Sequence, residues 1–92
     1  MDVMTHHFVP SETVKTVAVD ESLVLVDQKS GQYFGLNEVG GEIWRLLEEG
    51  NQAADIVTAI ASRFDASEEV IAIDTERILA ELVQAGLVTV GK

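Results

Sequence analysis

The side chains best suited to metal binding or acid–base catalysis are two histidines and several paired carboxylates. His6 and His7 are adjacent and have no further ligand set nearby in the sequence, so they make a poor metal site. Glu48–Glu49 and Glu68–Glu69 lie where helices are predicted to end or begin, and solvated acids are ordinary there. The chain has no cysteine, and its two histidines are neighbours, so no nucleophile, base and orienting group can be assembled. We therefore expect no catalytic residue, no metal and no cofactor.

Two other patterns have the look of attachment or phosphate-binding motifs. Glu21-Ser22-Leu23 resembles the Asp-Ser-Leu attachment site of acyl carrier proteins, which are also small and acidic. In those proteins the serine begins a helix, whereas Ser22 enters a β-rich run, so a phosphopantetheine carrier is only a third alternative. The glycines at positions 31, 35, 40 and 41 have neither GxGxxG spacing nor a P-loop lysine. The sequence thus favours a binding protein over an enzyme.

Composition narrows the class of partner. The chain has 92 residues, enough for one domain, and 16 acidic against 6 basic residues give a net charge of -10. Nucleic acid and an anionic membrane are disfavoured as main ligands, because both attract basic surfaces. The longest purely aliphatic run, at 23–26, is too short to span a bilayer, and the N-terminus does not resemble a signal peptide. We expect a cytoplasmic protein.

Hydrophobic periodicity predicts the elements that position any binding site. Residues 1–12 show no periodicity and are expected to form a flexible N-terminal arm before a single domain over 13–92. Apolar runs at 13–19, 23–27 and 32–36 predict an antiparallel meander, because their connections are too short for crossovers. Helical spacing predicts three helices, from Asn37 to Gly50, from Ala53 to Phe64 and from Ser67 to Ala85, and 87–90 is a last strand or extended tail.

The predicted fold is therefore α+β, with a three-stranded antiparallel sheet and a three-helix bundle that resembles a winged helix-turn-helix. In such domains the third helix normally reads DNA. Here the region of that helix carries six acids and only two arginines, which argues against DNA reading. A winged-helix transcription regulator stays as the rival from another class, and a basic groove face would reveal it.

The middle strand is apolar on both faces, since Leu23 and Leu25 point one way and Val24 and Val26 the other. The helices can cover one face. The second face needs another cover, and the sequence leaves three options open. These are the arm around residues 8–10, a second subunit or an apolar ligand.

The third predicted strand lies at the edge of the sheet and carries little protection against pairing. Gln32 to Leu36 contains no charge and no proline, and Gly35 allows close backbone approach or a bulge. An extended peptide could add to this edge as a further strand, or the third helix or the arm could cover it. Tyr33 and Phe34 point to opposite faces, and the sequence does not decide which of them would face a peptide.

The same region carries a family resemblance. Residues 27–40 read DQKSGQYFGLNEVG and residues 42–47 read EIWRLL, which resembles the PqqD-like family, with its LN-x-x-G turn followed by an I-W-x-L-L helix. The later segments IVTAI (56–60), Phe64-Asp65 and LAELVQAGLV (79–88) also fit. The resemblance covers about residues 14–90. Each segment is weak by itself, but their order and spacing are fairly specific.

The resemblance implies a non-catalytic recognition element that holds the leader of a ribosomally made precursor peptide. The leader would add to the third strand, lie against the third helix and be presented to a leader peptidase and a cyclase. The chain looks most like leader-binding proteins of lasso-peptide clusters, with a peptide chaperone of pyrroloquinoline quinone maturation as the alternative. A monomer or a weak dimer is expected. The implied peptide-binding residues are Gln32, Tyr33, Phe34, Gly35, Leu36, Asp74, Ile78 and Glu81, although Asp74 and Glu81 could equally be solvated surface acids.

Overall fold

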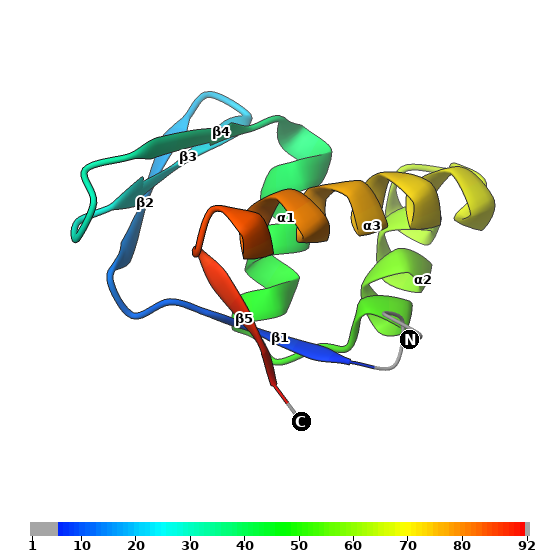
Figure 1. Ribbon diagram of the computed structural model, residues 1–92. Helices are drawn as coiled ribbons and strands as arrows, with labels where there is room; N and C mark the ends of the chain where they lie inside the picture. Colours follow the sequence, from blue (N-terminus) through cyan, green and yellow to red (C-terminus); the bar gives the residue numbers. More distant parts are fainter. Residues whose placement is uncertain (1–5, 92) are drawn as a thin grey trace.

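A computed structural model describes residues 6–91 of the chain (Figure 1). Four strands come first, then three helices and a last strand. The strands are β1 (His7–Pro10), β2 (Val14–Val19), β3 (Ser22–Asp27), β4 (Tyr33–Leu36) and β5 (Val88–Gly91). The helices are α1 (Glu38–Glu48), α2 (Ala53–Arg63) and α3 (Glu68–Gln84). The predicted α+β fold is confirmed.

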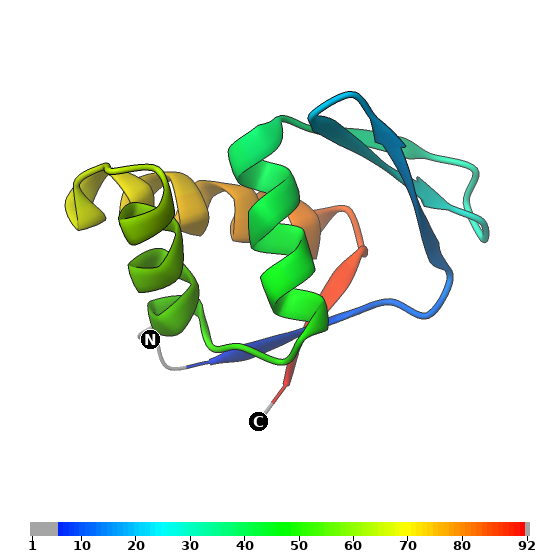
Figure 2. The same cartoon turned by 180° about the vertical axis from the view of Figure 1, so that it is seen from behind.

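Strands β2, β3 and β4 form an antiparallel sheet in that order, as the meander predicted. Helix α1 packs on β3 and lies between this sheet and α2, which is plain from both sides of the molecule (Figures 1 and 2). Because side chains alternate along a strand, Leu23 and Leu25 face α1, and Leu25 is fully buried.

The segment 7–10 differs from its sequence prediction. The sequence indicated an irregular arm there, and residues 1–5 of that arm lie outside the described residues. Strand β1 pairs antiparallel with β5, with Phe8 opposite Val90 and Pro10 opposite Val88. Phe8 is 4% exposed and joins the hydrophobic core. This strand was not predicted because four residues that include a proline are too few to show an alternation of apolar and polar side chains. Its partner strand also lies about eighty positions away in the sequence.

Helix α1 begins at a junction that explains the LN-x-x-G pattern. The Asn37 side-chain oxygen accepts a hydrogen bond from Gly40 N at 2.9 Å and caps the helix. Leu36 is buried, and a Cβ at Gly40 would lie 3.2 Å from two of its side-chain carbons. The end of β4 and the start of α1 are therefore closely packed, and a larger residue at position 40 would require the Leu36 side chain to shift by a few tenths of an ångström.

The core is mainly aliphatic and surrounds one tryptophan. Trp44, Ile43 and Leu47 of α1 are buried, and so are Ile71, Ile78, Leu79 and Leu82 of α3. The strand pair β1–β5 closes the base of this core, where β1 packs on α1 and β5 on α3.

The outer face of the sheet is not covered by the N-terminal segment in the part of the chain that the structure describes. Val17 and Val19 of β2 are half exposed and Tyr33 of β4 is 75% exposed on this face. Of the three covers left open by the sequence, the segment 8–10 is the one that the structure places elsewhere.

Candidate functional site

Strand β4 has one free edge. Within residues 6–91 it pairs with β3 only, and the hydrogen bond from Asp27 N to Gln32 O fixes which residues bond across the pair. Bonded and non-bonded pairs alternate in an antiparallel ladder, so Phe34 and Leu36 direct their backbone groups toward β3. The backbone N–H and C=O groups of Tyr33 and Gly35 therefore point to the free edge. The register runs through Gly35 without a bulge.

The faces of β4 separate its four side chains. Tyr33 and Gly35 lie on the outer face of the sheet, while Phe34 and Leu36 lie on the face toward the helices. Leu36 is buried in the core, whereas Phe34 is only half buried. The structure thus decides between the two aromatic residues: Phe34 faces α3 and Tyr33 points away from it.

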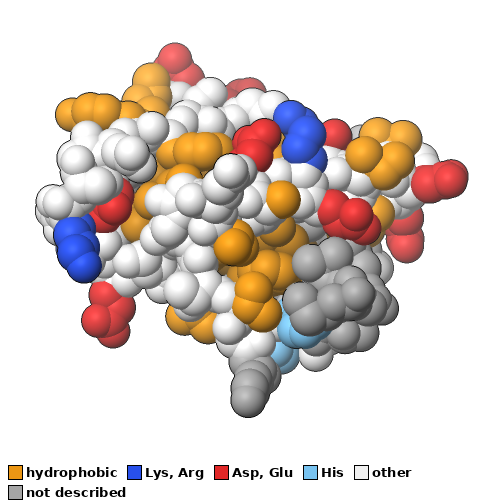
Figure 3. Space-filling view, viewed as in Figure 1, with side chains coloured by type: hydrophobic (Ala, Val, Ile, Leu, Met, Phe, Trp, Pro, Cys, Tyr) orange, Lys and Arg blue, Asp and Glu red, His pale blue; other side chains and the backbone are white. Residues whose placement is uncertain are grey.

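A groove lies between β4 and the C-terminal part of α3, and we call it the β4–α3 groove. It has a volume of about 350 Å³ and is lined by Gln32, Phe34, Glu81, Gln84 and Ala85. Hydrophobic side chains are exposed between the sheet and α3 on the face seen in Figure 3, with acidic side chains beside them. The free edge of β4 therefore lies beside a groove whose lining is partly apolar and partly acidic.

The structure brings three of the eight predicted residues into this groove, namely Gln32, Phe34 and Glu81. Asp74 and Ile78 occupy the same face of α3, at seven and three residues before Glu81, but do not line the groove itself. Ile78 is 9% exposed and belongs to the core, and Asp74 forms an ion pair of 3.6 Å with Arg77.

Sequence reasoning missed two groove residues, Gln84 and Ala85. They follow Glu81 by three and four positions, which is the spacing of neighbours on one helix face. That spacing was the available signal, but the prediction extended the face toward the N-terminus of α3 and not toward its end. The groove consequently lies nearer the C-terminus of α3 than predicted.

The turn between β3 and β4 sets the position of the free edge. The buried carboxylate of Asp27 accepts hydrogen bonds from Thr13 Oγ1 at 2.7 Å, Ser30 Oγ at 2.8 Å and Lys29 N at 3.2 Å. Gly31 closes the turn with φ +77°, a left-handed conformation that favours glycine. The D-x-x-S-G pattern is therefore a device that fixes the turn before β4.

The same hydrogen bonds change the acidity of Asp27. The hydroxyl groups of Thr13 and Ser30 donate to its carboxylate and lower its pKa below the usual 3.8, while its burial opposes them. Asp27 is therefore ionised at neutral pH and holds the turn through charge-assisted hydrogen bonds.

Within residues 6–91, no group of three or more His, Cys, Asp and Glu side chains could hold a metal ion. No helix in the same range is long and apolar enough to cross a membrane.

Comparison with known proteins places this geometry in a family. The family model described as coenzyme PQQ synthesis protein D (PqqD) matches residues 22–88, which run from the start of β3 to the start of β5. The chain belongs to the PqqD family. No curated protein matches it in sequence.

Two solved structures are similar to this PqqD-family chain. TbiB1 in complex with the TbiA(beta) leader peptide is 34% identical, with a TM-score of 0.80 over 87% of this chain and 93% of that chain. A lasso peptide synthetase B1 complexed with the leader peptide has the same TM-score at 23% identity, over 90% of this chain and 98% of that chain. The second likeness shows a shared fold.

Proposed function

We propose that this PqqD-family protein binds the leader segment of a ribosomally made precursor peptide, which adds as a strand to the free edge of β4. The observation that supports this most directly is that the free edge lies beside the β4–α3 groove. Edge strands recognise extended peptides through backbone hydrogen bonds, and adjacent pockets select side chains. The likeness to TbiB1, which was solved with a leader peptide, supports the same function.

The residues divide the recognition between backbone and side chains. Tyr33 and Gly35 offer their free N–H and C=O groups to the leader, since those groups point away from β3. Phe34 offers an apolar surface, and Gln32 and Glu81 flank it in the groove. Leu36 and Ile78 support the site from the core below.

The acidic side chains of α3 favour a leader with a basic or hydroxyl group. Glu81 is exposed and no ion pair is recorded for it within residues 6–91, so it is available to a cationic partner. Asp74 lies two turns earlier on the same face and would release Arg77 to make a similar contact. Such contacts are partly solvated, so they adjust specificity more than total affinity.

We further propose a non-catalytic role in lasso-peptide biosynthesis, with the leader presented to a leader peptidase and a cyclase. The alternative within the family is a peptide chaperone of pyrroloquinoline quinone maturation, in keeping with the name of the family model. The leader-bound relative with 34% identity favours a protein that works on leaders in either setting. The structure does not support the hypothesis of a DNA-binding winged-helix regulator, because α3 carries acids along the exposed face that lines the groove.

A titration followed by amide NMR tests the proposal. The labelled protein is titrated with a synthetic leader of the precursor peptide encoded beside its gene, and the TbiA(beta) leader peptide serves as a reference. We expect shifts concentrated at residues 32–36 and along the Asp74, Ile78 and Glu81 face of α3, with micromolar or tighter affinity. A precursor peptide of quinone maturation, titrated in parallel, separates the two family settings.

A verified leader that leaves these amides unchanged would contradict the proposal. The free β4 edge would then be assigned to pairing between two copies of the chain, which sedimentation at increasing protein concentration would detect. Shifts confined to the outer face around Tyr33 would contradict the groove but not the binding of a peptide.

A further inference from the structure

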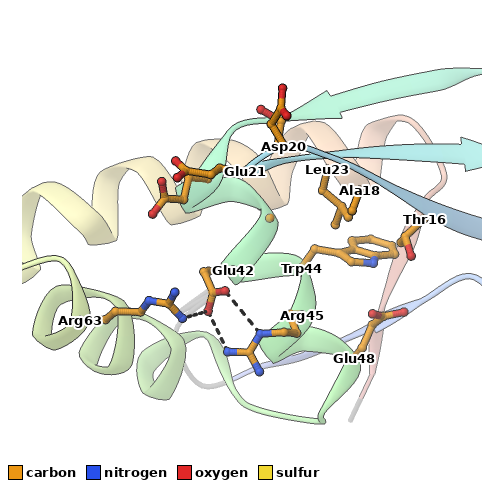
Figure 4. A pocket seen from close by; sticks show the side chains of 13 residues that line it. Thr16, Ala18, Asp20, Glu21, Leu23, Glu42, Trp44, Arg45, Glu48 and Arg63 are labelled. Carbon is orange, nitrogen blue, oxygen red and sulfur yellow. Dashed lines mark hydrogen bonds and ion pairs between the residues drawn. The ribbon is translucent and has the colours of Figure 1, made fainter.

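A second cavity lies at the opposite edge of the sheet from β4. Its volume is about 510 Å³, and it opens between the β2–β3 hairpin and α1 (Figure 4). We call it the β2–α1 cavity. The lining side chains fall into an apolar group, which includes Ala18, Leu23 and Trp44, and a charged group, which includes Glu21, Glu38 and Arg63.

Carboxylates outnumber cations in the charged group. Asp20, Glu21, Glu38, Glu42 and Glu48 face two arginines, Arg45 and Arg63. Both arginines already form ion pairs with Glu42, at 2.7 Å and 3.0 Å, and these pairs are drawn in Figure 4. Within residues 6–91 the other four carboxylates form no ion pair. The cavity therefore carries an excess of negative charge.

Two of these carboxylates lie against each other. The Glu21 carboxylate is close enough to raise the pKa of Glu38. A cation between the two carboxylates would oppose this rise in the pKa of Glu38, because it would replace their mutual repulsion by attraction. Arg63 acts on Glu38 in the same direction, but it is held by Glu42.

A buried hydrogen-bond donor belongs to the same cavity. Trp44 is 1% exposed and lines the cavity, and its Nε1 has no hydrogen-bond partner within the described residues. Its indole lies beside Thr16 and below Ala18 and Leu23 in Figure 4. Buried N–H groups are normally paired, so this one points to an acceptor brought by a ligand.

The free backbone of β2 meets this cavity. The hydrogen bond from Gln28 N to Thr13 O fixes the alternation between β2 and β3, so Thr16 and Ala18 direct their backbone N–H and C=O groups away from β3. The side chains of the same two residues line the cavity. Lys15, which would repel a cation, lies on the other face of the sheet.

We propose that the β2–α1 cavity receives an arginine or lysine side chain of a second protein, whose extended segment pairs with the free edge of β2 at Thr16 and Ala18. The side chain enters between Glu21 and Glu38, and a carbonyl of the segment accepts from Trp44 Nε1. Because β3 separates β2 from β4, this partner and a peptide at β4 occupy different edges. The cavity thus suits a basic segment of a protein that acts on the bound leader.

The test uses the acetylated and amidated pentapeptide Thr-Val-Arg-Val-Thr as the probe, with a citrulline analogue that keeps the shape and removes the charge. The chain has one tryptophan, so the indole N–H resonance belongs to Trp44 without ambiguity. We expect the arginine peptide to shift this resonance and the amides of Thr16 and Ala18 in a saturable way. We expect the affinity of the citrulline analogue to be lower by about tenfold or more.

Matched variants separate the cavity from general acidity. Glu21→Gln with Glu38→Gln is expected to weaken the arginine peptide about fivefold or more, because it removes the carboxylate pair. Glu12→Gln with Glu76→Gln changes the net charge equally at exposed positions and leaves the affinity unchanged. Ala18→Pro removes one free backbone donor of β2 and weakens both the arginine peptide and its analogue.

Three results at the cavity itself would each overturn the proposal. They are an unmoved Trp44 resonance up to millimolar peptide, equal binding of the citrulline analogue, and an unchanged affinity in the Glu21 and Glu38 variant. Shifts at Tyr33 and Gly35 in place of Thr16 and Ala18 would show that the probe uses β4, and this also overturns it. Leader binding at β4 is measured separately, so its failure is distinguishable from failure at β2.

Discussion

Ser30 donates a hydrogen bond of 2.8 Å from its hydroxyl to Oδ2 of Asp27, across the turn that leads into β4. Thr13, the residue before β2, donates to the other carboxylate oxygen of the same residue at 2.7 Å. One buried carboxylate therefore ties together the approach to β2, the end of β3 and the turn before β4. This carboxylate therefore helps to fix the position of the free edge that we propose for leader binding.

The first prediction concerns Asp27 and pH. The folded state lowers the pKa of Asp27 below 3.8, so its carboxylate stabilises the fold at pH values above the unfolded pKa. That contribution is lost as pH falls below about 4 and through the lower folded pKa. We expect Asp27→Asn to lower Tm by about 5 °C at pH 7 and the gap from the unaltered protein to shrink toward pH 2.

Thermal unfolding between pH 7 and pH 2 measures this gap directly. Glu76→Gln, at an exposed position of α3, is the control and should show no gap that closes with acid. A gap of constant size at all pH values would mean that Asp27 acts through shape and not through its charge.

The second prediction separates the two aromatic residues of β4. Phe34→Ala removes an apolar surface from the β4–α3 groove, so leader affinity should fall about tenfold or more. Tyr33→Ala removes a side chain that is 75% exposed on the other face, so the affinity should stay within about twofold. Anisotropy of a labelled leader gives both values. The reverse order would place the leader on the outer face of the sheet.

The helices and the main sheet could be predicted from the sequence because each depends on local pattern. Asn37, Ser67 and Gly86 mark helix ends through caps that act within a few residues. The short connections of the meander left one topology. The strand pair of β1 with β5 was not predictable in this way, because Phe8 and Val90 are partners only once the core has formed.

The candidate site was predictable in part for the same reason. Strand alternation and edge position indicated the free edge of β4, and the family resemblance implied Asp74 and Glu81 of α3. The part of α3 that lines the groove could not be predicted from local sequence, because it depends on where the sheet crosses the helix. The groove therefore includes Gln84 and Ala85 and not Asp74.

A third prediction tests a polar group inside the core. Thr75 of α3 is fully buried, and its Oγ1 has no hydrogen-bond partner in the part of the chain that the structure describes. Thr75→Val keeps the shape and removes the unpaired hydroxyl, so the free energy of unfolding should rise by about 1 kcal/mol. Thr75→Ser keeps the hydroxyl, loses a methyl group and should lower stability by about 1 kcal/mol. A loss of stability in the valine variant would show that the hydroxyl is paired.

The fourth prediction isolates the backbone contribution of Gly35. Its N–H points to the free edge, so a proline there removes a donor from the leader and none from the β3–β4 ladder. Proline also disfavours only helical backbone at the preceding residue, and Phe34 is already extended. A side chain is tolerated, since a Cβ at Gly35 meets nothing within 4 Å.

Gly35→Ala is the matched control, because alanine adds the Cβ and keeps the N–H. We expect Gly35→Pro to weaken leader binding about tenfold or more, roughly the worth of one hydrogen bond left unmade in an interface, and Gly35→Ala to bind as the unaltered protein does. Calorimetric titration with the leader gives both affinities, and thermal unfolding checks that each variant folds. If the folded proline variant retains full affinity, the leader does not pair with this strand, and side chains of the groove alone must hold it.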